Sequence, residues 1–384
     1  MIVTCKEANA LRASVLASVE QVAPLLDRTA AESERERTLC REALDALHDA
    51  GLFGMWVPQE AGGLGADLVT QVDALVELAR ADMSAAWTLM IGNTVTGTMA
   101  ACLPDAGFRE VFGGPRMPVA AGSLRATGRA TSTATGGYRV TGTWGFGSGI
   151  HHAEWIVANC RVDGGESGTH ERVSLVIPIA DASIADDWRA SGMRGSGSSS
   201  YSVREVDVPA RRVLGERQRG DPFAAAPGAR LPLEHAAVSL GGARRALDEV
   251  ANLAATKRRM GASSSLANDP TFRRDLGRLE AEWSSLAAGV RAAVLELEAE
   301  PPPQPATSTA NATHLHAVCA FATEKSLAIA SRAIRHAGAW AGMEGQPLER
   351  IHRDLTIATQ HVMVSDTAYE ALGEERLRAT AVMQ

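Results

Sequence analysis

With 384 residues, 45% of them hydrophobic, the chain is long enough for two or three domains with sizeable apolar cores. The formal net charge of −7 argues against a nucleic-acid-binding surface, and we expect no membrane span because no apolar run is long enough. Residues 1–15 lack the apolar core of a signal peptide. The five cysteines are scattered without metal or disulfide spacing, which favours a reducing, cytoplasmic compartment.

The first part of the chain is predicted to be helical. Residues 8–52 carry apolar side chains at spacings of three and four, and Gly51 is a stop signal. A glycine-rich loop is expected over residues 53–67, followed by helices over residues 68–81 and from Ser84 onward.

The middle of the chain changes to β-structure and then returns to helix. Residues 116–220 contain four alternating runs separated by Gly, Asp and Pro: YRVTGTW, WIVANCRV, RVSLVIPI and YSVREVDV. After Pro232 the helical pattern continues to about Arg378, broken by a proline-rich hairpin at residues 300–305. The order predicts an α+β, mostly α fold. Its expected parts are an N-terminal helical domain (1–115), a middle β-barrel-like domain (116–222) and a C-terminal helical bundle (223–384).

A glycine-interleaved stretch between two of the expected strands is the first candidate site. Gly145, Gly147 and Gly149 leave the backbone bare around Trp144, Phe146 and Ser148. Glycine inside a strand indicates a bulge or the close approach of a ligand. Two aromatic rings and a hydroxyl on such a backbone would form a platform for a planar ring. The alternative is a bend at a sheet edge with both aromatic rings in the core.

Four segments together resemble the acyl-CoA dehydrogenase fold over nearly the whole chain. In chain order they are VPQEAGGLGAD (57–67), GGYRVTGTWGFGSGIHHAEW (136–155), GMRGSGSSSYSVREVDVPARRVLG (192–215) and PLERIHRDLTIATQH (347–361). The resemblance implies a C-terminal four-helix bundle. It also implies a homodimer or homotetramer, because flavin sites in this family are completed across subunits.

The dehydrogenases of this family need a carboxylate base. Its commonest place, nine residues beyond Arg353, holds Val362 here, and valine cannot abstract a proton. A second placement on the helix near residues 233–239 leaves Glu234 available. An acyl-CoA dehydrogenase therefore stays an alternative, as does a non-catalytic flavin-fold partner protein.

Two further patterns resemble the flavin-dependent two-component monooxygenases built on this fold. They are the Arg-Asp…Gln-His ending at His361 and the run Trp-x-Phe-x-Ser-Gly-x-x-His from Trp144 to His152. Named relatives of this type are hydroxyphenylacetate hydroxylases, steroid-ring phenol hydroxylases and amino-sugar N-oxygenases. The resemblance implies that reduced FMN or FAD diffuses from a separate flavin reductase. With O2, it would hydroxylate or N-oxygenate a small molecule.

The resemblance also assigns catalytic roles. Ser148 lies where the family places a hydroxyl that retains the proton of flavin N5, and His361 where a histidine faces the carbon that binds oxygen. A histidine suits proton transfer because its ordinary pKa, ~6.5, is close to neutral pH. The alternatives are a turn serine bonded to its own backbone and a helix histidine bonded to a core carbonyl. No metal site is expected, because His151 and His152 lack a third ligand at metal spacing.

Cofactor-binding residues implied by the resemblance are Trp144, Phe146, Ser148, Arg258, Arg259 and Gly338. Residues 257–261 resemble an Arg-x-x-Phe-Gly segment in which Lys257 holds the arginine's place by count. Arg258 or Arg259 can pair flavin phosphate oxygens, and a solvated helix end is the alternative. Residues 336–340 resemble a Gly-Gly segment, with Gly338 as the second glycine.

The expected substrate-binding residues are Trp87, Asn93 and His152. Relatives that hydroxylate phenols often carry a histidine on the helix after Ser-x-x-Trp, whereas residues 84–94 contain none. This favours N-oxygenation of an amine or hydroxylation of a less acidic ring. The composition, rich in Ala, Gly and Arg, resembles that of a high-GC bacterium and suggests secondary metabolism.

Overall fold

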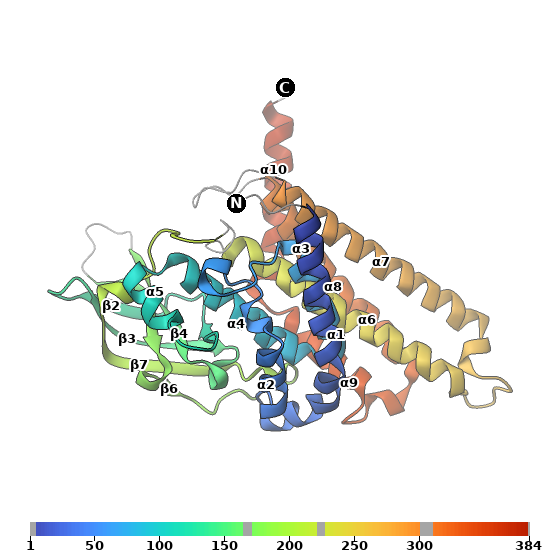
Figure 1. The fold of residues 1–384 in the computed structure, drawn as a ribbon. Coiled ribbons are helices and arrows are strands. Elements are labelled where there is room, and N and C mark those ends of the chain that lie inside the picture. The colour runs from blue at the N-terminus through green and yellow to red at the C-terminus, as the bar shows by residue number, and fades with distance from the viewer. Residues whose placement is uncertain (1–4, 164–170, 221–226, 300–309, 383–384) are drawn as a thin grey trace. The chain divides into compact units, whose positions relative to one another are not determined.

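The computed structural model describes residues 5–163, 171–220, 227–299 and 310–382, and the chain divides into two compact units (Figure 1). Unit 1 comprises residues 1–67, 87–189 and 194–227. Unit 2 comprises residues 68–86, 190–193 and 228–384. The helix at residues 68–81 is thus grouped with the C-terminal helices, while the other N-terminal helices are grouped with the sheet. The proline-rich hairpin expected at residues 300–305 lies outside the described residues.

Unit 1 begins with helices, of which all but α5 lie where the periodicity predicted helix. They are α1 (Cys5–Glu36), α2 (Arg41–Asp49), α4 (Met83–Cys102, of which Trp87 onward belongs to this unit) and α5 (Asp105–Phe112). Gly51 follows the end of α2 with φ 71°, a left-handed conformation that glycine adopts without steric cost. The predicted helix stop at Gly51 is therefore confirmed.

The seven strands of unit 1 form one sheet. They are β1 (Ala120–Gly122), β2 (Gly128–Ser132), β3 (Tyr138–Gly147), β4 (Trp155–Val162), β5 (Arg172–Pro178), β6 (Ser183–Ile184) and β7 (Ser199–Val208). The order is β1-β4-β2-β3-β7-β6, with β5 also pairing β4. Among the described strands, β1 and β2 each run parallel to a different part of β4, and the remaining strand pairs are antiparallel. Leu175 of β5 and Tyr201 of β7 belong to the same buried cluster, as expected for a strongly curved sheet.

Unit 2 is helical and contains α3 (Leu68–Ala81), α6 (Pro227–Thr256), α7 (Pro270–Glu298), α8 (Ala310–Ala337), α9 (Pro347–Ala358) and α10 (Thr367–Val382). Asp269 caps α7 by accepting hydrogen bonds from the N–H groups of Thr271 and Phe272. The long helices α7 and α8 pack against each other (Figure 1). The predicted fold class, mostly helical with one region of β-structure, is confirmed.

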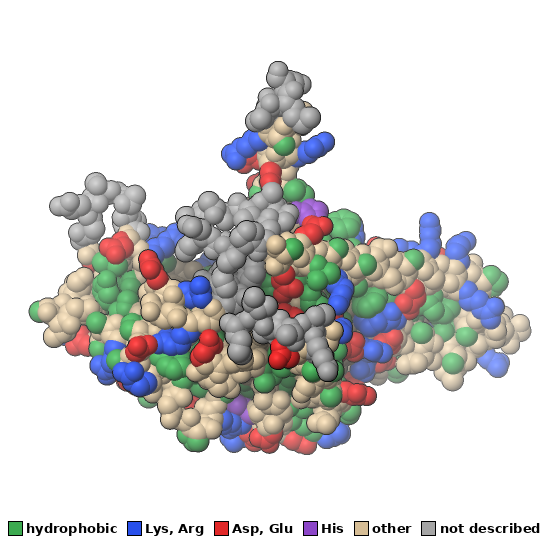
Figure 2. All heavy atoms as spheres, turned by 45° about the horizontal axis from the view of Figure 1, so that its top comes forward, with side chains coloured by type: hydrophobic (Ala, Val, Ile, Leu, Met, Phe, Trp, Pro, Cys, Tyr) green, Lys and Arg blue, Asp and Glu red, His purple; other side chains and the backbone are tan. Residues whose placement is uncertain are grey.

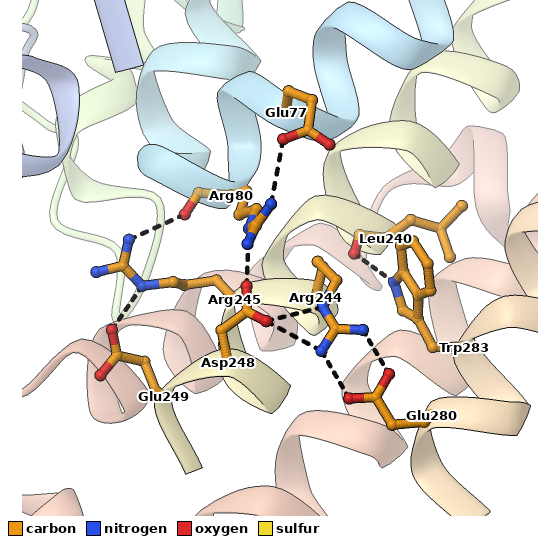
Figure 3. A network of polar contacts seen from close by, with 9 residues as sticks. All are labelled: Glu77, Arg80, Leu240, Arg244, Arg245, Asp248, Glu249, Glu280 and Trp283. Carbon is orange, nitrogen blue, oxygen red and sulfur yellow. Dashed lines mark hydrogen bonds and ion pairs between the residues drawn. The ribbon is translucent and has the colours of Figure 1, made fainter. Parts of the chain in front are cut away.

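A polar network joins α3, α6 and α7 within unit 2 (Figure 3). The guanidinium of Arg244 on α6 makes two hydrogen bonds to Glu280 of α7, at 2.6 and 2.7 Å, and also pairs with Asp248 at 3.0 Å. Arg80 of α3 donates to the same Asp248 at 2.7 Å. Trp283 lies 5.2 Å from the Arg244 guanidinium and donates to a backbone carbonyl of α6. These contacts fix the spacing of the three helices because planar guanidinium groups demand defined partner positions.

The described surface carries both signs of charge. On the face drawn in Figure 2, basic and acidic side chains are interspersed. None of the described helices is long and apolar enough to cross a membrane. Among the same residues, no group of His, Cys, Asp and Glu has the arrangement of a metal site.

Candidate active site

The end of β3 separates the two aromatic rings that the sequence placed on one platform. Trp144 is fully buried, stacks on Tyr201 with ring centres 5.4 Å apart, and donates to the carbonyl of Asn159 at 2.8 Å. Phe146 is 64% exposed and has φ 63°. A register shift between Trp144 and Gly147 marks the bulge that the interleaved glycines indicated. The core interpretation therefore holds for Trp144 but not for Phe146, whose ring is largely exposed and lies edge-to-face with Trp188 at 6.4 Å between ring centres.

Ser148 lies directly after this bulge and is part of a buried hydrogen-bonded chain. The indole N–H of Trp87 on α4 donates to the Ser148 hydroxyl at 3.0 Å. The hydroxyls of Ser148 and Ser198 are 2.7 Å apart, and those of Ser198 and Ser196 are also 2.7 Å apart. Ser148 is 6% exposed, and its hydroxyl is held by side chains from two other segments rather than by its own turn.

An unsatisfied hydroxyl lies beside the same turn. Gly149 has φ 73°, and a Cβ added there would lie 3.1 Å from the Cγ2 atom of Thr88. Thr88 is 1% exposed, and its hydroxyl has no hydrogen-bond partner among the residues that the structure describes. Buried polar groups normally have partners, so an orphan of this kind points to a bound ligand or water. The hydroxyls, the glycines and the exposed ring of Phe146 fit a planar ligand with polar edges, as a flavin has.

Asn93 and His152 are held by other parts of unit 1. The Asn93 side chain accepts from the N–H of Trp56 at 3.2 Å and donates to the carbonyl of Leu52 at 2.9 Å. It therefore braces the loop after α2 against α4. His152 contacts the Thr38 hydroxyl at 2.8 Å through Nε2, and burial lowers the pKa of His152 to about 4. Its ring is neutral at neutral pH.

In unit 2, His361 follows α9 and packs against a second histidine, with the two rings tilted by 33°. Nδ1 of His361 accepts from the N–H of Met363 at 3.3 Å, so the neutral ring carries its proton on Nε2. Burial lowers the pKa of His361 to about 4. The ring of His235 on α6 lies 4.0 Å away and is fully buried. Its Nδ1 donates to the carbonyl of Leu231, and burial and the nearby His361 lower its pKa.

Sequence reasoning missed His235. The one feature of the sequence that could have indicated His235 is its position next to Glu234, on the helix that could carry the base of a dehydrogenase. Glu234 itself is 1% exposed. Val362, at the commonest position of that base, is 67% exposed.

The Arg-Asp pair at residues 353–354 holds residues 190–193 against α9 within unit 2. Asp354 accepts from the N–H of Met193 at 2.5 Å, and Arg353 donates to the carbonyl of Ser191 at 2.7 Å. Arg353 also pairs with Glu349 one turn earlier. Burial raises the pKa of Asp354 to about 7.

The basic segment after α6 approaches Gly338 through Lys257. A Cβ added at Gly338, which has φ 71°, would lie 3.6 Å from the Lys257 ammonium nitrogen. Arg258 and Arg259 are exposed, and Arg259 pairs with Asp269 at 2.8 Å. The structure thus brings Lys257, which holds the family's arginine place by count, to the predicted glycine. A pocket of about 230 Å³ is formed by residues of α6 and of the segment that follows Gly338. It is lined by Glu249, Asn252, Leu253, Trp340, Gln346, Pro347 and Leu348.

Comparison with known proteins identifies two matching domains and several similar monooxygenases. Residues 6–103 match the acyl-CoA dehydrogenase N-terminal domain, and residues 233–366 match the acyl-CoA dehydrogenase C-terminal domain. Indole-3-acetate monooxygenase of Pseudomonas putida is 27% identical over 95% of both chains. The flavin-dependent monooxygenase oxygenase subunit HsaA of Rhodococcus jostii is 33% identical, over 51% of this chain and 50% of its own.

Solved structures show the same fold. XiaF from Streptomyces sp., in complex with FADH2 and glycerol, has a TM-score of 0.87 and 26% identity, with 96% of each chain covered. The 3-HSA hydroxylase of Rhodococcus sp. RHA1 has a TM-score of 0.84 at 24% identity, covering 95% of this chain and 96% of its own. The predicted recognition is confirmed: the chain belongs to the acyl-CoA dehydrogenase-fold family, among the homologues of its flavin-dependent monooxygenases.

Proposed function

We propose that this protein is the oxygenase component of a two-component monooxygenase. It takes reduced FMN or FAD from a separate flavin reductase, and it uses O2 to hydroxylate or N-oxygenate a small molecule. Reduced flavin supplies the two electrons with which one oxygen atom enters the substrate and the other leaves as water. The observation that carries the proposal is the buried Ser148 hydroxyl, held by Trp87 and Ser198 two residues after the exposed Phe146.

Each candidate residue has a role in this proposal. Phe146 offers a ring face to the flavin, and Ser148 accepts a hydrogen bond from N5–H and so retains that proton. His361, neutral and protonated on Nε2, donates a hydrogen bond where oxygen reacts. Trp144 supports β3 from the core. Lys257, Arg258 or Arg259 pairs with the flavin phosphate beside Gly338.

The substrate is a small amine or an aromatic ring less acidic than a phenol. Residues 84–94 carry no group that removes a phenolic proton, and Asn93 is committed to backbone groups. Trp87 and His152 shape the substrate side in this proposal, and the neutral ring of His152 repels neither an amine nor an aromatic ring.

Mixing the protein and reduced flavin with oxygen tests the function. We expect the visible absorbance of oxidised flavin to return more slowly than in free solution, with less hydrogen peroxide released. Bleaching of bound oxidised flavin by an acyl-CoA would instead support a dehydrogenase that uses Glu234. If flavin binds in neither redox state, the protein is a non-catalytic partner.

We also propose that the protein is a homodimer or homotetramer, as the family resemblance implies. Light scattering at micromolar concentration tests this, and a monomer would contradict it.

A further inference from the structure

Four buried side chains form a continuous hydrogen-bonded chain that runs from Trp87 through Ser148 and Ser198 to Ser196. Trp87, Ser148, Ser198 and Ser196 are 7, 6, 5 and 1% exposed. Their three contacts measure 3.0, 2.7 and 2.7 Å in that order. The backbone bond from the N–H of Gly149 to the carbonyl of Ser196, at 2.8 Å, holds the two serine segments together. A buried chain of this kind is stable only when every hydroxyl is satisfied.

The number of hydrogen-bond donors restricts the directions in which these four side chains can donate to one another. An indole nitrogen only donates, so one lone pair of the Ser148 oxygen always accepts from Trp87. Ser198 bonds both Ser148 and Ser196, and its single hydrogen serves one of them. When Ser148 donates to Ser198, and Ser198 to Ser196, the second lone pair of Ser148 is left for a ligand. When the direction is reversed, the hydrogen of Ser148 is left instead.

We propose that Ser198 is a positioning residue that sets whether Ser148 accepts a hydrogen bond from the flavin or donates one to it. The inference rests on the proposed function, in which Ser148 faces flavin N5. Reduced N5 carries a hydrogen and donates, whereas oxidised N5 has a lone pair and accepts. The serine chain satisfies both states by reversing its three hydroxyl hydrogens, with no movement of heavy atoms.

Removal of the Ser198 hydroxyl should therefore affect the two redox states unequally. In Ser198→Ala, the hydrogen of Ser148 has lost its protein acceptor and is directed toward the ligand. That orientation suits oxidised flavin and opposes the N5–H of reduced flavin. The ratio of the dissociation constant of reduced flavin to that of oxidised flavin should rise about 2- to 12-fold. This factor corresponds to the net free energy of one hydrogen bond.

Anaerobic titrations of the full chain with reduced and oxidised FMN, and in parallel FAD, measure this ratio. Ser199→Ala is the matched control, because Ser199 is the next residue, 2% exposed, and its hydroxyl contacts His151 at 3.0 Å outside the chain. Its ratio should equal that of the wild type. Ser196→Ala should shift the ratio in the same direction as Ser198→Ala but by less, because Ser148 keeps its acceptor.

The outcomes separate this inference from the proposed function. If Ser148→Ala weakens the binding of both redox states and Ser198→Ala leaves the ratio unchanged, the positioning role is wrong while Ser148 remains at N5. An equal loss of affinity for both redox states in Ser198→Ala also refutes the positioning role, because it indicates a structural role. If Ser148→Ala changes the affinity for neither redox state, Ser148 does not face N5. Should Ser198→Ala fail to fold, Ser196→Ala decides by the same measurement.

Discussion

Gly192 provides the sharpest test of the packing in unit 2. A Cβ at this position would lie 2.1 Å from the carbonyl oxygen of Arg353 and 2.3 Å from its carbonyl carbon. Both atoms belong to the backbone of α9, so they cannot rotate away as the end of a side chain would. In Gly192→Ala, residues 190–193 must therefore move off the helix.

The cost follows from the contacts that this movement breaks. The N–H of Met193 loses the Asp354 carboxylate, and the carbonyl of Ser191 loses the guanidinium of Arg353. Hydrogen bonds to charged groups contribute about 1.5–3 kcal/mol each, so the loss of two should lower the free energy of unfolding by about 3–6 kcal/mol. That is a large part of the stability of an ordinary domain, ~5–15 kcal/mol.

Urea unfolding of the two variants Gly192→Ala and Gly277→Ala, followed by circular dichroism, checks the reasoning. Gly277 lies within α7 with nothing within 4 Å of the added Cβ, so the same substitution should stabilise there by about 0.5–1 kcal/mol. The two variants should therefore shift the urea midpoint in opposite directions. If the free energy of unfolding of Gly192→Ala lies within about 1 kcal/mol of the wild-type value, residues 190–193 do not depend on close packing against α9.

Four further predictions follow from the site and its surroundings. Ser148→Ala should bind reduced flavin within about tenfold of the wild type, but oxidation without substrate should release hydrogen peroxide roughly 5- to 150-fold faster; an unchanged leak would contradict the role of Ser148. His361→Ala should lower oxygen transfer more than flavin affinity, and an equal loss of both would indicate a structural role. Because burial raises the pKa of Asp354 to about 7, the folded chain retains a proton that the unfolded chain releases near pH 4. The free energy of unfolding should therefore fall as pH rises from about 4 to 7 and then level off. In Asp354→Asn the urea midpoint should not fall over this pH range, and a fall equal to that of the wild type would contradict the role of Asp354. A double-mutant cycle of Arg244→Met and Glu280→Gln should give a coupling of about 1 kcal/mol, since the pair is partly exposed, and a coupling near zero would contradict its role.

The sequence was sufficient to predict the order of the elements, because periodicity and glycine or proline breaks are local signals. It also indicated the bulge at the end of β3. It did not predict which aromatic ring is open, since Trp144 and Phe146 are two residues apart and a regular strand would place them on one face. The positive φ of Phe146 reverses that expectation.

Contacts between distant segments explain what else was missed. His235 and His361 are brought together only by the packing of unit 2. Nothing in the local sequence of either histidine indicates the other. The serine chain shows the same limit, because neither the glycine-interleaved stretch around Ser148 nor the serine-rich run at residues 196–200 specifies which hydroxyls meet.

The buried ring of Trp144 has a consequence for how sequences of this fold diverge. A Cβ at Gly128 would lie 2.3 Å from the indole, and one at Gly142 would lie 2.8 Å from it. Each position also has a second neighbour: the Cβ at Gly142 would lie 2.6 Å from the backbone Cα of Gly128, and the Cβ at Gly128 would lie 2.7 Å from Sγ of Cys160. A homologue with a small residue in place of the tryptophan should therefore still keep both glycines, because loss of the indole alone does not make room for a side chain at either position.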